Sequence, residues 1–204
     1  MNTPVKHKDF QVALQEEVSE LVGNSFGQLL KFDANEKKFS IVGGSDVEFG
    51  HEYVALCDQF ARGWVKFVDK KPVEVRIKKL TEGQPPTRKE LDDEDLADSE
   101  DDPWVFQRYL PLQDVKTGEV VTFVGKSIGS KIALGNLLNT YSIGSRHGRP
   151  IIKLALGWFN TTDYGKKPRP DFAPVGWLGD GPAAAEGLPD NDPNDPGYDL
   201  LESR

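Results

Sequence analysis

The strongest constraint on the fold is the order of the elements that the sequence predicts. Several short runs alternate apolar and polar residues and are bounded by glycine, proline or paired lysines, which is typical of strands buried on one face. One longer stretch has apolar residues at helical spacing, with Ser130 as its expected N-cap and Gly144 as its end. The predicted order is strand 52–69, strand 73–80, strand 119–126, helix 130–141, strand 150–160 and strand 172–178. We therefore expect a mainly β fold with minor α content, of the α+β class.

Five strands with one helix between strands three and four follow the order of an OB-fold barrel, which binds oligonucleotides or oligosaccharides. We predict an OB-like five-stranded barrel within residues 51–178, with 104–112 as an extra strand beside the third. A β-sandwich built from the same strands is the alternative. Residues 1–50 are predicted to form an N-terminal extension, with a helix over 8–22 and a β-hairpin around the turn 33–36.

Charge is distributed unevenly along the chain. In total 25 Lys and Arg face 33 Asp and Glu, a formal charge of −8. Residues 87–103 hold nine acids and two bases, and 178–204 hold seven acids and one base, whereas 104–177 hold ten bases and four acids. This pattern predicts a basic binding domain with a flexible acidic insertion over 81–103 and a disordered acidic tail over 179–204. Simple solubilisation by acidic segments is the other explanation.

The residue content argues against several classes of protein. No apolar run approaches the roughly 18 residues needed to span a bilayer, and the N-terminal residues lack a signal-peptide core. The single Cys57 allows neither an intrachain disulfide nor a cysteine-rich metal site, and the three histidines are scattered. Gly125-Lys126-Ser127 resembles the end of a P-loop, but Val120 stands where that motif needs glycine. We expect a cytoplasmic protein without metal, cofactor or enzymatic activity.

Basic and aromatic residues are interleaved along several of the predicted strands. Single-stranded nucleic acid is held by cations that follow its phosphates and by flat rings on which its bases stack. The residues expected to neutralise phosphates are Lys66, Arg76, Lys78, Lys126, Lys153, Lys166, Lys167 and Arg169. The residues expected to stack on bases are Trp64, Trp104, Tyr109 and Tyr164. Four other aromatic residues are assigned to the core, namely Phe67, Phe123, Trp158 and Trp177.

Four short stretches carry a resemblance to a known family. They are Gly-Trp-Val-Lys-Phe-Val-Asp-Lys-Lys-Pro-Val-Glu at 63–74, Asp-Pro-Trp-Val-Phe-Gln-Arg-Tyr-Leu-Pro-Leu at 102–112, Gly157-Trp158 followed by Tyr164-Gly165-Lys166, and Pro-Val-Gly-Trp at 174–177. Together they resemble phage and prophage proteins that are similar to OB-fold single-stranded DNA-binding proteins, over residues 50–178. The resemblance implies a role in phage-type DNA replication or recombination inside a bacterium, with no catalytic residue to carry over.

The acidic tail also looks like the tails by which such proteins recruit replication and recombination enzymes. It departs from the usual bacterial ending, a few acids followed by Pro-Phe, because this chain ends Tyr-Asp-Leu-Leu-Glu-Ser-Arg. That departure puts the binding of standard bacterial partners in doubt.

These observations predict a non-enzymatic single-stranded DNA-binding protein whose affinity falls as salt rises. The first alternative is a phage or bacterial structural protein whose β-rich domain mediates assembly, with the aromatic residues as interface anchors. The second alternative is an oligosaccharide-binding module, which uses the same fold and does not need the cations. The choice between DNA and RNA and the oligomeric state, a homodimer among the options, stay open at this point.

Overall fold

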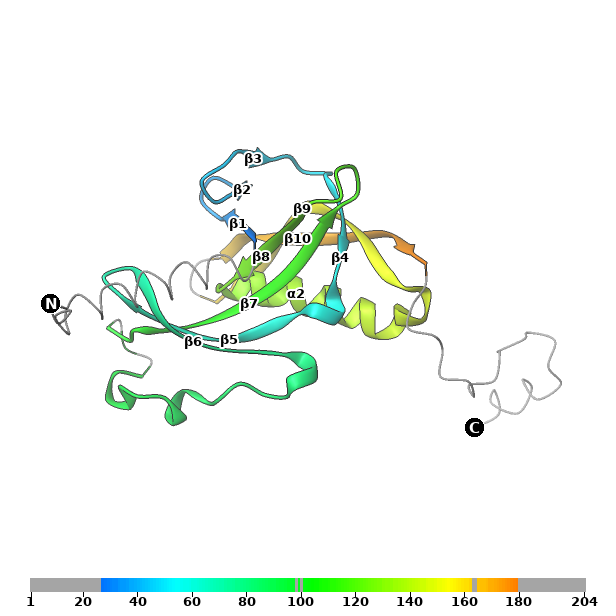
Figure 1. The fold of residues 1–204 in the computed structure, drawn as a ribbon. Coiled ribbons are helices and arrows are strands. Elements are labelled where there is room, and N and C mark those ends of the chain that lie inside the picture. Colours follow the sequence, from blue (N-terminus) through cyan, green and yellow to red (C-terminus); the bar gives the residue numbers. More distant parts are fainter. Residues whose placement is uncertain (1–26, 98, 100, 163–164, 180–204) are drawn as a thin grey trace, which may run out of the picture.

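The computed structural model describes residues 27–97, 99, 101–162 and 165–179. In these ranges the chain is mainly β, and its ten strands pair into one curled, open sheet that forms a half-barrel around a helix (Figure 1). This confirms the prediction of a mainly β, α+β fold. The helix predicted over 8–22 and the tail beyond Gly179 lie outside the described residues.

The strands are β1 (Gln28–Asp33), β2 (Lys38–Ile41), β3 (Asp46–Val47), β4 (Glu52–Ala55), β5 (Ala61–Val68), β6 (Lys71–Lys79), β7 (Trp104–Asp114), β8 (Val120–Gly125), β9 (Arg149–Thr161) and β10 (Gly165–Leu178). The helix is α2 (Ile128–Gly144), and the 3-10 turns are η1 (Cys57–Gln59), η2 (Leu80–Glu82), η3 (Arg88–Glu90), η4 (Glu94–Leu96) and η5 (Ser145–His147). The predicted strand 52–69 is divided by η1 into β4 and β5. The predicted hairpin is present as β1 and β2, and the predicted extra strand is present as β7.

The curl of the sheet comes from β7, which has two different partners along one edge. β4 pairs with its C-terminal end, where Tyr53 faces Asp114, and β5 pairs with its N-terminal half, where Lys66 faces Trp104. β8 pairs with the other edge of β7. Because β4 and β5 diverge at η1, the hairpin of β5 and β6 extends away from the rest of the half-barrel (Figure 1).

The sheet is an open half-barrel, and the sequence predicted an OB-like five-stranded barrel. In the described part of the chain, β6 pairs only with β5 and β10 pairs only with β9, while β7 lies between β5 and β8. β10 begins at Gly165, seven residues before the strand predicted over 172–178, and carries Pro168, Pro170 and Pro174. A proline has no N–H to offer a further strand, so these residues suit an edge strand and oppose additional pairing.

The core lies between the half-barrel and α2. Phe123 on β8 is fully buried and packs edge-to-face on Phe172 of β10, with ring centroids 5.0 Å apart. Leu134 and Leu137 on α2 are buried in the same cluster, which fixes the helix against the sheet. In the described residues, no helix combines the length and apolar character required to cross a membrane.

The start of α2 differs from the prediction by one turn. Ser127, and not Ser130, is the N-cap, because its hydroxyl accepts a hydrogen bond from the Ser130 N–H at 3.1 Å. The helix ends at Gly144 as predicted, where the ring of Trp177 would lie 2.2 Å from an added Cβ.

Gly63 on β5 lies against the backbone of β6 and supports a first prediction. A Cβ at this position would lie 2.0 Å from the Arg76 carbonyl oxygen and 2.6 Å from the Ile77 Cα. Gly63→Ala must push the two strands apart, so we expect the free energy of unfolding to fall by about 2–3 kcal/mol. Urea denaturation measures this change.

Gly135 provides the control, because it is exposed on α2 with nothing within 4 Å of an added Cβ. Gly135→Ala should raise the free energy of unfolding by about 0.5–1 kcal/mol, since alanine favours a helix interior. A Gly63→Ala protein as stable as the wild type would contradict the close approach of β5 and β6.

Candidate nucleic-acid interface

Residues 80–103, which join β6 to β7, form a segment that we call the acidic strap. The sequence predicted a flexible insertion here, because acids dominate and few apolar residues offer a core. The structure instead contains η2, η3 and η4 in the strap and buries Leu91. Arg88 fixes the strap internally, because its Nε and Nη2 each donate to the Asp102 carboxylate at 2.9 Å. The same guanidinium donates to the carbonyl oxygens of Asp92 and Asp93, so Arg88 ties together the two ends of this part of the strap.

Under the strap, nine side chains of β6, β5 and β7 form what we call the cation–aromatic array. Direct cross-strand partners in an antiparallel sheet project from the same face, so the strand register defines three rows. The first row is Lys78, Arg62 and Arg108, the second is Arg76, Trp64 and Phe106, and the third is Glu74, Lys66 and Trp104. The array brings together five residues predicted to bind nucleic acid: Lys66, Arg76, Lys78, Trp64 and Trp104.

The aromatic and basic members of the array contact one another. Trp64 and Phe106 pack edge-to-face with ring centroids 5.0 Å apart. The Lys66 Nζ lies 5.7 Å from the Trp104 ring centroid, which is cation–π distance. Sequence reasoning missed Arg62, Phe106 and Arg108 as site residues, although they have the same two-residue spacing as Trp64 and Trp104 on their strands.

The strap touches all three rows of the array. In the first row the Arg62 Nη2 donates to Gln84 Oε1 at 2.7 Å, and in the second the Trp64 Nε1 donates to the Pro86 carbonyl at 2.9 Å. In the third row Asp92 accepts from the Trp104 Nε1 at 2.9 Å. The strap therefore covers the array with hydrogen-bond acceptors, the groups that a nucleic-acid strand also presents.

The third row carries the strongest electrostatic contact with the strap. The Lys66 ammonium forms ion pairs with Asp92 and, at 2.7 Å, with Asp93. The hydrogen bond to Asp92, followed by that to Asp93, raises the pKa of Lys66, and the bond to Lys66 lowers the pKa of Asp92. Trp104 is only 4% exposed. Lys66 and Trp104 are therefore occupied while the strap is in place.

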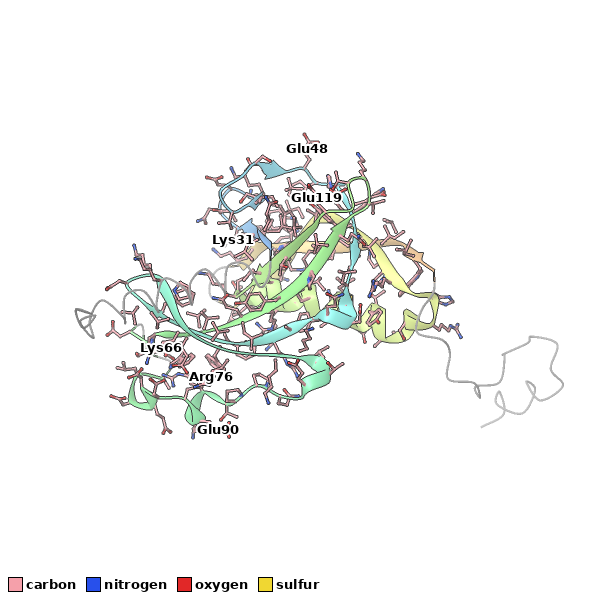
Figure 2. All side chains as sticks on the ribbon, in the orientation of Figure 1. Lys31, Glu48, Lys66, Arg76, Glu90 and Glu119 are labelled. Carbon is pink, nitrogen blue, oxygen red and sulfur yellow. The ribbon has the colours of Figure 1, made fainter. Side chains whose placement is uncertain are left out.

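The β6 edge of the array is more open. A cleft of about 590 Å³ lies between β6 and the strap and is lined by Arg76, Glu90 and Leu91 among others. Figure 2 shows Lys66 and Arg76 between the β5–β6 hairpin and the part of the strap that carries Glu90. The Arg76 side chain is 58% exposed and pairs with Glu74 at 2.6 Å, and Lys78 is exposed. A ligand can approach the array from this edge.

A second cluster lies near the turn between β9 and β10, and we call it the Trp158 cluster. Trp158 was assigned to the core, but it is 41% exposed because β9 extends beyond the buried part of the sheet. The Nζ atoms of Lys37 and Lys166 lie 5.6 Å and 5.3 Å from its ring centroids. Lys166 is thus one predicted phosphate-binding residue beside an exposed ring, whereas Tyr164 lies outside the described residues.

Three other predicted residues have structural partners instead. Tyr109 is 3% exposed and donates its hydroxyl to Gln107 Oε1 at 2.7 Å, so it is a core residue and not a stacking platform. The Arg169 side chain is largely buried beside Gly157 and pairs with Asp171 at 2.6 Å. Lys153 pairs with Glu52 at 3.3 Å on the neighbouring strand. Tyr109 and Arg169 are therefore too buried to meet a ligand as they lie, whereas the Lys153 side chain, like that of Arg76, is partly exposed beside a carboxylate.

The remaining predicted cations, Lys126 and Lys167, are exposed. Lys126 lines a second cleft, of about 450 Å³, beside the half-buried Phe67. Of the other residues assigned to the core, Phe123 is buried and Trp177 is half-buried.

Among the described residues, the side chains that commonly bind metals are dispersed and Cys57 is buried. Across these ranges, no three His, Cys, Asp or Glu side chains come together in a way that could hold a metal ion. Burial raises the pKa of the Cys57 thiol to about 12, so this cysteine is protonated and unreactive at neutral pH.

Comparison with known proteins does not assign the chain to a family. No protein-family model matches the chain, and no curated protein or solved structure is significantly similar to it. The resemblance to phage proteins therefore stays a prediction from the four stretches.

Proposed function

We propose that the protein is a non-enzymatic single-stranded DNA-binding protein. The observation that carries this proposal is the cation–aromatic array, in which five cations and three aromatic rings share one face of three adjacent strands. Stacking of a base on an aromatic ring contributes about 1–3 kcal/mol, and each neutralised phosphate adds a salt-dependent contribution. An oligosaccharide-binding surface would use the rings but would have no need of five cations.

The arrangement of elements supports an OB-like site. The segments β4–β5, β6, β8, α2, β9 and β10 follow the order of an OB-fold, with β7 inserted beside β8. OB-folds bind their ligands on the face of strands two and three and in the loops that join strands one to two and four to five. The array includes β6, the second strand, and the Trp158 cluster lies at the β9–β10 connection. The array shares its second strand with the OB binding face, and the Trp158 cluster lies at the connection of strands four and five, which supports the proposal.

In this proposal the acidic strap competes with the DNA strand. The carboxylates of Asp92 and Asp93 hold Lys66 as phosphates would, and Asp92 also engages Trp104. Binding at the third row therefore requires the strap to move, whereas Arg76, Lys78 and the Trp158 cluster are exposed without such movement. A role in phage-type replication or recombination, with partners recruited by the acidic tail, is part of the proposal and rests on the sequence resemblance.

Fluorescence anisotropy of a labelled oligothymidine of about 30 nucleotides, titrated at several salt concentrations, tests the proposal. We expect tight binding at low salt that weakens as salt rises and that exceeds binding to duplex DNA. Arg76→Gln/Lys78→Gln should lower the affinity about tenfold. The matched control is Lys116→Gln/Arg146→Gln, which removes the same charge from exposed positions off the array and should change affinity less than about twofold.

The possible failures of this experiment are distinct. No binding at low salt contradicts the proposal, and salt-insensitive oligomers in that case favour the assembly protein. Equal losses in both double variants would mean that overall charge, and not the array, holds the strand.

The Trp158 cluster supports a separate prediction. Trp158→Ala should lower the affinity for oligothymidine about five- to tenfold, because it removes an exposed ring flanked by Lys37 and Lys166. Trp158→Phe keeps a ring and should retain most of the affinity. Since the side chain is exposed, both variants should melt near the wild-type temperature. An unchanged affinity in the alanine variant would place the DNA path elsewhere.

A further inference from the structure

Two arginines of the first row, Arg62 on β5 and Arg108 on β7, are direct cross-strand partners. Both side chains are half-buried. Like charges directly opposite each other in a sheet are destabilising, and burial adds to the cost. The guanidinium of Arg108 lies 4.9 Å from the centroid of the Phe106 ring, which stabilises its position but supplies no negative charge.

Neither arginine has a carboxylate partner within the described ranges of the chain. Burial, and then the charge of Arg62, lowers the pKa of Arg108. The Arg62 Nε is buried and has no hydrogen-bond acceptor, while the Nη2 of the same group donates to the neutral amide of Gln84. A buried donor without an acceptor is rare in folded proteins and calls for an explanation.

Two other cations of this region, unlike Arg62 and Arg108, have carboxylate partners. Lys66 pairs with Asp92 and Asp93, and Arg88 pairs with Asp102. The strap has ten acidic residues, yet the strap residue that accepts a hydrogen bond from Arg62 is the neutral Gln84. The strap therefore supplies carboxylates to the third row of the array, whereas Lys78, Arg62 and Arg108 of the first row have no ion pair with a described residue.

We propose that Arg62 and Arg108 form a phosphate-binding site that takes one phosphodiester group of the bound DNA strand, an inference that rests on the proposed function. A guanidinium presents its donors in a planar fork that matches the oxygens of a phosphate. A phosphate here supplies an acceptor for Arg62 Nε and the negative charge that the pair lacks. Trp64 and Phe106 form the adjacent row, where the neighbouring base can stack.

The test compares Arg62→Gln/Arg108→Gln with the control Lys116→Gln/Arg146→Gln, and it uses two readouts. The first is the melting temperature in sodium phosphate against sodium chloride of equal ionic strength. We expect phosphate to raise the melting temperature of the wild type and the control by about 2–4 °C, and to have no effect on the arginine variant. In chloride the arginine variant should melt at or above the wild-type temperature, because a like-charge repulsion is removed.

The second readout is the salt dependence of oligothymidine binding. For single strands, the slope of log affinity against log salt changes by about 0.7 for each phosphate contact. The arginine variant should lose about tenfold in affinity and about 0.7 in slope, and the control should keep its slope. If the glutamine variant does not fold, Arg62→Lys/Arg108→Lys replaces it; this variant keeps the charge and loses the fork, so it should lose the phosphate response.

The outcomes separate this site from the function on which it rests. Wild-type binding to DNA with the same slope and affinity in the arginine variant would overturn the phosphate site and leave the proposed function standing. No DNA binding by the wild type, with a phosphate response that the arginine variant loses, would overturn the proposed function and keep the site for free phosphate. If the arginine variant keeps both the phosphate-induced rise in melting temperature and the wild-type salt dependence of DNA binding, the phosphate site is overturned whatever the function of the protein.

Discussion

Asp92→Asn/Asp93→Asn is expected to raise the affinity for oligothymidine at least about tenfold. These two carboxylates hold Lys66, and the substitution removes their charge. An asparagine amide oxygen can still accept from the Trp104 Nε1, so the shape of the contact is retained. The DNA strand then meets a free Lys66 ammonium, because the strap competes less strongly for that group. Anisotropy titrations at fixed salt measure the change.

The matched control is Glu94→Gln/Asp95→Asn in η4. It makes the same change in net charge within the same strap, and neither residue has an ion pair with any described residue. We expect less than about a threefold gain in affinity for it. Equal gains in the two variants would mean that the strap acts only through its total charge. No gain in the first variant would show that the strap does not compete at Lys66.

Arg88→Gln is expected to release the strap and to speed its proteolysis about tenfold. The guanidinium of Arg88 holds the Asp102 carboxylate and two strap carbonyls, and its side chain is only 9% exposed. Without it, the turn from η3 to residue 102 loses its internal anchor, and local opening exposes the backbone. A protease that cleaves after acidic residues, followed by mass spectrometry, locates and times the cuts.

Lys89→Gln is the control for this release, because it removes the same charge from the adjacent exposed residue. The control should be cut at the wild-type rate. Equal cutting rates in the Arg88 variant and the control would mean that the strap is held by its contacts with the array and not by Arg88.

The elements of the fold were largely predictable from the sequence, whereas the pairing of distant strands, which leaves the sheet open, was not. Val73, Val75 and Ile77 alternate with charged residues, so β6 could be predicted from one segment of the chain. Whether β8 pairs with β6 or with β7 depends on segments that are far apart in sequence. β8 pairs with β7, which leaves the sheet open, and no local sequence pattern predicts this pairing.

The candidate site was predictable where the residues share one strand. Trp64 and Lys66 lie two residues apart, so they project from the same face, and their partners on β6 follow from the hairpin. The exposure of Trp158 depends on how far β9 extends past the core, which the spacing of residues does not reveal. The strap was predicted to be flexible from its acidity, and the anchoring by Arg88 and the burial of Leu91 depend on tertiary contacts.

The strap is part of the same chain as the array that it covers, and this has a consequence for any binding measurement. A tethered competitor has a fixed effective concentration, so diluting the protein does not remove it. The observed affinity is then the intrinsic affinity multiplied by the fraction of molecules whose strap is displaced. Salt weakens the ion pairs of Lys66 with Asp92 and Asp93 as well as the contacts with DNA. The two effects oppose each other, so counting phosphate contacts from the salt slope of the wild type will give too few.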